Sequence, residues 1–96
     1  MQPTDTKHRM TEHLLRCQNK ARDLARKENR VEPRQIIEFE RQLDLLSAKL
    51  NLGWDKLRQF EQAPSQEDRR AIKASLERIA NEIENAIDSA WSKVTL

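Results

Sequence analysis

The sequence predicts an all-α protein, an antiparallel three-helix bundle with coiled-coil-like packing. Apolar residues recur at alternating spacings of three and four in three stretches of similar length, which places them along one face of a helix. Prolines lie between the stretches, where the chain must turn. With 35% charged residues and one glycine in 96 residues, the composition suits solvated helices better than a sheet with tight turns.

The first helix is expected over residues 5–31. One position of its apolar row is occupied by an acid, Glu28. Because a carboxylate in a bundle core is costly, we expect the bundle to be open to water there, with a basic neighbour beside Glu28. The less favoured alternative is a buried Glu28 with a raised pKa, suited to proton transfer. The row consists of Met10, Leu14, Cys17, Ala21, Leu24 and Val31.

The second helix is expected over residues 34–62, and its row contains the glycine, Gly53. A continuous helix would let a neighbouring helix approach closely at Gly53. Alternatively, the helix ends at Gly53 and Asp55 caps a short further helix. We favour continuity, because a helix of about 28 residues, ~42 Å long at about 1.5 Å per residue, matches its two companions. The other members of the row are Ile36, Phe39, Leu43, Leu46, Leu50, Leu57 and Phe60.

The third helix is expected over residues 66–95, after Pro64. Ser65 and Asp68 resemble a capping box, in which a hydroxyl and a carboxylate satisfy free N–H groups at a helix start. A chain of this length has room for one core, so residues 1–96 are expected to form a single domain. The third row comprises Ile72, Leu76, Ile79, Ile83, Ala86 and Ala90, widened by Ala80, Ile87 and Val94.

Three apolar residues of the second helix, Ile37, Leu45 and Leu52, fall outside its row, and the two leucines are seven residues apart on the far side. Exposed apolar rows commonly mark contact surfaces. We therefore expect these residues and Trp54 to contact another protein or a second copy of the chain, as in a homodimer. Alternatively, the second helix is covered on several sides within the monomer, or the spacing shifts near Gly53. The favoured function is a non-catalytic interaction or assembly module.

Positive charge is concentrated in residues 1–34, which hold nine Lys or Arg and five acids, although the whole chain is only at +2. One explanation is pairing across helices, since basic residues recur every seven positions beside the first row, at His13, Lys20, Lys27 and Arg34. The alternative is contact with nucleic-acid phosphates or an acidic partner, through Arg9, Arg16, Arg22, Lys27 and Arg30. Pairing is favoured, because this part of the chain lacks aromatic residues for stacking on bases.

Chemistry-bearing motifs are sparse. His13 and Cys17 stand four residues apart on one helical face, but zinc needs at least three protein ligands, and His8 turns to a different face. One glycine cannot form a phosphate loop, and no serine or cysteine has an evident base and orienting acid. We expect no metal and no cofactor. A small helical-bundle enzyme is the least favoured function.

Apolar runs are no longer than two or three residues, and the N-terminal residues lack the apolar core of a secretion signal. One cysteine cannot form an internal disulfide. The expectation is therefore a cytoplasmic protein that does not enter membranes.

Overall fold

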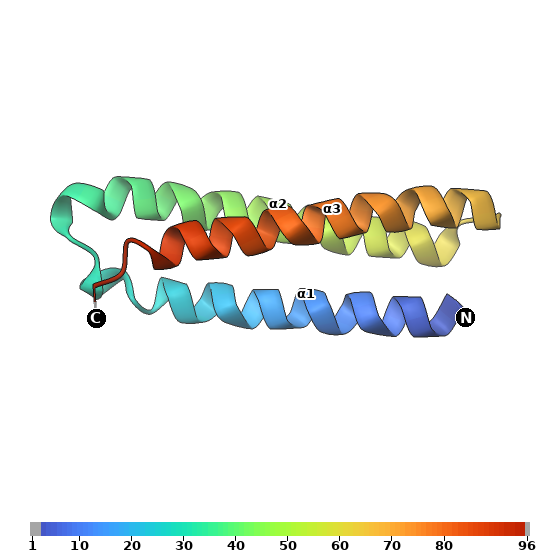
Figure 1. Cartoon of the computed structure of the whole chain (residues 1–96), viewed down its shortest axis with the longest axis horizontal. Helices are drawn as coiled ribbons and strands as arrows, with labels where there is room; N and C mark the ends of the chain where they lie inside the picture. Colours follow the sequence, from blue (N-terminus) through green and yellow to red (C-terminus); the bar gives the residue numbers. More distant parts are fainter. Residues whose placement is uncertain (1–2, 96) are drawn as a thin grey trace.

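Three helices lie side by side along a rod of 50 × 18 × 15 Å, and successive helices run antiparallel (Figure 1). The computed structural model describes residues 3–95, with side chains from residue 6 onward. Every pair of helices is in contact, which confirms the predicted three-helix bundle. The elements in order are α1 (Pro3–Ala25), the 3-10 turns η1 (Glu28–Arg30) and η2 (Pro33–Gln35), α2 (Ile36–Gln62) and α3 (Gln66–Trp91). In this part of the chain, no helix is both long enough and apolar enough to cross a bilayer.

The core is built from the three apolar rows that the spacing predicts. Each helix turns its row inward because this removes apolar surface from water, at about 25 cal/mol per Å². Met10, Ala21, Leu43 and Trp54 are only partly buried and pack around this core. The buried members include Leu14, Cys17 and Leu24 from α1, Phe39, Leu46, Leu50, Leu57 and Phe60 from α2, and Leu76, Ile79, Ile83, Ile87 and Ala90 from α3.

The first helix ends at Ala25, earlier than the predicted 31. A further helical turn would carry Glu28 into the core row, and a buried carboxylate is costly. The chain instead forms η1, and Val31 adopts extended backbone that pairs with Val94 in an isolated antiparallel bridge. Val31 is therefore buried as predicted, although it is not helical.

The environment of Glu28 differs from the expectation. Glu28 is half-buried, but among the described residues its partner is an acid, Glu40 of α2. A hydrogen bond with Glu28, followed by the charge of Glu28, raises the pKa of the Glu40 carboxyl. No ion pair among the described residues joins Glu28 to a base, and the neighbour that the structure shows is this acid of α2.

The second helix is continuous through Gly53, as favoured from the sequence. Gly53 is buried, and a Cβ atom built on it would lie 2.9 Å from Cδ2 of Leu14 and 3.7 Å from Cγ2 of Ile79. The neighbour that approaches closely here is α1, through Leu14. Glycine therefore serves packing at this position and does not end the helix.

The third helix begins with the predicted cap, since the Ser65 hydroxyl accepts a hydrogen bond of 3.1 Å from the backbone N–H of Asp68. It ends at Trp91, before the predicted 95. After a turn, Val94 pairs with Val31, and the Thr95 N–H donates to the Arg30 carbonyl at 2.9 Å. The last residues leave the helix because they close against the connection between α1 and α2.

Candidate functional site

An apolar row on α2 faces away from the core. Ile37 is 72% exposed, Leu45 45% and Leu52 46%. Seven residues make almost two helical turns, so Leu45 and Leu52 lie one above the other. Within the described residues, no other helix covers this side of α2, so the alternative that the leucines are buried inside the monomer is wrong.

The same side of α2 carries a charge toward each end. Arg41, Ala48 and Asp55 are also exposed, and they lie three or four residues from the apolar residues of this side. We call the full line the α2 outer row. It consists of Ile37, Arg41, Leu45, Ala48, Leu52 and Asp55. Within this row, the apolar residues from Leu45 to Leu52 are flanked by Arg41 toward the start of the helix and by Asp55 toward its end.

Trp54 does not belong to this row. It follows Leu52 by two residues, which is about 200° around a helix, and it is partly buried against the core. The structure therefore brings together Ile37, Leu45 and Leu52 but separates Trp54 from them. Two exposed apolar residues on the other helices, Leu15 of α1 and Trp91 of α3, were not singled out from the sequence.

The five basic residues proposed for a phosphate or acidic contact do not share one face. Arg9 and Arg16 line a groove of about 500 Å³ between α1 and α3. Arg22 lines a different groove, of about 220 Å³, between α1 and α2. Lys27 lies between α1 and η1, and Arg30 ends η1. Arg22 is separated because six residues from Arg16 correspond to about 240° around the helix.

The basic first helix pairs with its neighbours through its lysines. Lys7 is 3.1 Å from Glu61 of α2, and Lys20 is 3.4 Å from Glu84 of α3. No ion pair within the described residues involves the proposed contact set, Arg9, Arg16, Arg22, Lys27 and Arg30. The structural explanation of the charge therefore holds for the two lysines and leaves the arginines exposed to solvent.

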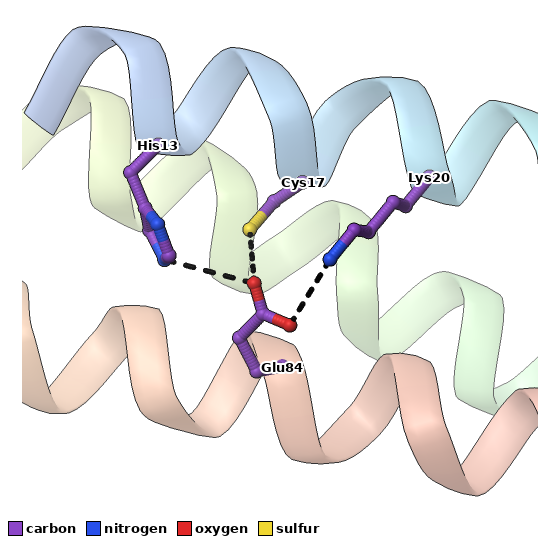
Figure 2. A network of polar contacts seen from close by, with 4 residues as sticks. All are labelled: His13, Cys17, Lys20 and Glu84. Atoms are coloured by element: carbon purple, nitrogen blue, oxygen red, sulfur yellow. Dashed lines mark hydrogen bonds and ion pairs between the residues drawn. The ribbon is translucent and has the colours of Figure 1, made fainter.

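Glu84 of α3 is the centre of a polar cluster with three residues of α1 (Figure 2). The Cys17 thiol donates to Glu84 Oε1 at 3.3 Å, and the Lys20 ammonium donates to Oε2 at 3.4 Å. His13 Nε2 lies 3.7 Å from Oε1, which is too long for a hydrogen bond. The three α1 residues are four and three positions apart, so they stand on successive turns of one face.

Burial and charge set the protonation of this cluster. Burial, together with the hydrogen bond to Glu84 and the charge of Glu84, raises the pKa of the Cys17 thiol to about 11. Burial also acts to raise the pKa of Glu84, but the hydrogen bond from Cys17, the charge and hydrogen bond of Lys20 and the charge of His13 outweigh it and lower that pKa. At neutral pH the cluster therefore holds a protonated thiol beside an ionised carboxylate.

Sequence reasoning considered His13 and Cys17 as a pair, set the pair aside for lack of a third ligand, and missed Glu84. Glu84 follows the core residue Ile83 and stands beside the row of α3, a position open to any flanking charge. Which turn of α1 faces it depends on the register between two helices that are far apart in the sequence. The local spacing carries no signal for that register.

The fold and the outer row define the class of this protein as a small all-α bundle with an exposed apolar face. No protein-family model, curated protein or solved structure matches the chain. Function is therefore inferred from the contacts, exposure and charges of its own residues.

Proposed function

We propose that this chain is a non-catalytic protein-interaction module that self-associates through the α2 outer row. The observation that carries the proposal is the exposure of Leu45 and Leu52, 45% and 46%, on the side of α2 opposite its core residues. Burial of apolar surface between two molecules is favourable by about 25 cal/mol per Å², before the cost of association. Two leucines seven residues apart also match the spacing at which helices pair in coiled coils.

The charges of the row favour a second copy of the chain in antiparallel orientation. If two α2 helices cross antiparallel at Ala48, Leu45 of one copy, three residues from the crossing, lies within one residue of Leu52 of the other, four residues from it. The same crossing puts Arg41 opposite the second copy's Asp55, since both are seven residues from Ala48. A parallel pairing would instead put Arg41 beside Arg41 and Asp55 beside Asp55, which is repulsive. The antiparallel arrangement is a closed two-fold contact.

The double change Leu45→Glu, Leu52→Glu should reduce the mass in solution from a dimer to the 11.3 kDa monomer. Four carboxylates in one small contact would repel one another and replace apolar surface. Light scattering coupled to size exclusion measures the mass, and circular dichroism should show nearly unchanged helix. Ala71→Glu, Ala74→Glu is the matched control, because it adds the same charges to exposed positions of α3 and should leave the mass unchanged.

The antiparallel orientation of the two α2 helices is tested by the same measurement of mass in solution. Arg41→Asp alone and Asp55→Arg alone should each weaken the dimer, and the combined reversal should restore it. Each of these residues also has a neighbour on its own helix, Glu38 for Arg41 and Arg58 for Asp55, but such exposed pairs contribute little. A wild-type chain that stays monomeric, or a Leu45→Glu, Leu52→Glu variant that stays dimeric, would contradict the proposal.

Binding to nucleic acid is the second candidate, and the observation that favours it is that Arg9 and Arg16 form no ion pair with any described residue, although Glu12 and Glu77 line the same groove. Their seven-residue separation aligns them along the groove between α1 and α3. The chain should slow the migration of duplex DNA or RNA in a gel, and this shift should weaken as the salt concentration rises. Arg9→Ala, Arg16→Ala should weaken binding across sequences, whereas Arg58→Ala, Arg70→Ala on α2 and α3 should not. No shift of the wild-type chain at low salt removes this candidate.

A further inference from the structure

We propose that His13, Cys17 and Glu84 form a binding site for a zinc ion between α1 and α3. The ligands are His13 Nε2, Cys17 Sγ and Glu84 Oε1, and water completes the coordination. Zinc accepts this combination of nitrogen, sulfur and oxygen, and three protein ligands with one open position are sufficient. The site is independent of the proposed self-association, which uses the outer side of α2.

The distances within the cluster match a tetrahedral ion. The three donor atoms all lie within 4.8 Å of one another. Sγ of Cys17 and Nε2 of His13 are 3.3 Å and 3.7 Å from Glu84 Oε1. Ligand distances of about 2.0–2.3 Å from zinc separate tetrahedral donors by about 3.3–3.7 Å. Two of the three separations therefore already fit, and the third, between nitrogen and sulfur, has to close by about 1.2 Å at most.

An unsatisfied atom also points to a missing ligand. His13 Nε2 is buried and has no hydrogen-bond partner, although the ring as a whole is one third exposed. Buried polar atoms are nearly always paired, so such an exception needs a physical explanation. A metal ion held between Nε2 and Glu84 Oε1 would give this nitrogen a partner.

The surrounding charges allow a divalent cation. On binding, zinc displaces the thiol proton to water, and the resulting thiolate and the Glu84 carboxylate match the two positive charges of the ion. Lys20 contacts Oε2 and leaves Oε1 to the metal, so its hydrogen bond can hold the carboxylate in place.

The site is accessible from solvent. His13 forms part of the wall of the groove of about 500 Å³ between α1 and α3. Cys17 and the Nε2 atom of His13 are buried, so an ion would reach them past the one-third exposed side chains of His13 and Glu84. Arg9 and Arg16 line the same groove together with Glu12 and Glu77, so the open position faces a surface of mixed charge.

Titration of the reduced, untagged chain with Zn²⁺ alone should show one ion bound per chain by calorimetry. Co²⁺ should give the near-ultraviolet absorption band of a cobalt–thiolate bond, and Zn²⁺ should remove it by displacement. His13→Ala and Glu84→Gln should each weaken Zn²⁺ binding at least tenfold, and Cys17→Ala should abolish the thiolate band.

Two matched controls separate this site from general attraction of cations to histidine or acids. His8→Ala removes the other histidine, which is exposed and pairs with Glu12, and Glu82→Gln removes a carboxylate two residues before Glu84 that pairs with Lys49. Both should bind Zn²⁺ within twofold of the wild-type chain. The proposal is overturned if wild type gives no thiolate band, or if His13→Ala and Glu84→Gln, folded by circular dichroism, bind Zn²⁺ as tightly as the controls.

Discussion

Phe39→Ala should lower the free energy of unfolding by about 3–5 kcal/mol, the usual cost of removing a buried phenylalanine and leaving a cavity. Phe39 is 0% exposed and is the largest fully buried side chain among the described residues. A domain of this size is stable by about 5–15 kcal/mol, so this one change would remove a large share of the total. Urea unfolding followed by circular dichroism measures the loss.

The matched control is Leu15→Ala, which also truncates a large apolar side chain but at an exposed position of α1. Little apolar surface returns to water there, and no cavity forms. We expect a loss of less than about 1 kcal/mol. Equal losses for Phe39→Ala and Leu15→Ala would mean that Phe39 does not lie in the core.

Gly53→Leu should have the second large effect, because the added side chain meets α1. A Cβ atom at this position already lies 2.9 Å from Leu14 Cδ2, and Leu14 is itself buried. Gly53→Ala should stay within about 1 kcal/mol of wild type, since the gain of about 1 kcal/mol in helix preference offsets a small shift of Leu14. Gly53→Leu should be about 2–3 kcal/mol less stable than Gly53→Ala, because the core is overpacked.

A double-mutant cycle identifies the partner of Gly53. Combining Gly53→Leu with Leu14→Ala should recover part of the stability that each change loses alone, since the leucine on α2 fills the space vacated on α1. Urea unfolding of the four proteins gives the coupling energy. Additive losses would mean that Gly53 does not face Leu14.

The three apolar rows predicted most of the core, because the spacing of residues along one helix determines which of them can face the same neighbour. The ends of the helices were less predictable. Val31 is buried as its place in the row suggests, yet it is extended and pairs with Val94, a contact between opposite ends of the chain. Glu28 marked a break in the row of α1, but the sequence did not show that the helix ends before it or that Glu40 of α2 lies beside it.

The residues of the candidate sites were likewise predictable only in part. Ile37, Leu45 and Leu52 could be recognised from the sequence because they deviate from the row of their own helix. Trp54 was grouped with them because it is close in sequence, although two residues turn a side chain through about 200° around a helix. Glu84 could not be recognised, because nothing in its neighbourhood distinguishes it from the other flanking acids of α3.

The sequence by itself determined three helices and the face that each of them buries, and it favoured a helix continuous through Gly53. These properties follow from the fixed geometry of a single helix, in which position along the chain sets direction around the axis. The tertiary structure decided which turn of α1 meets which turn of α3, and so placed Glu84 beside His13 and Cys17. Such a register arises from many weak contacts between residues distant in the chain, and local spacing does not encode it.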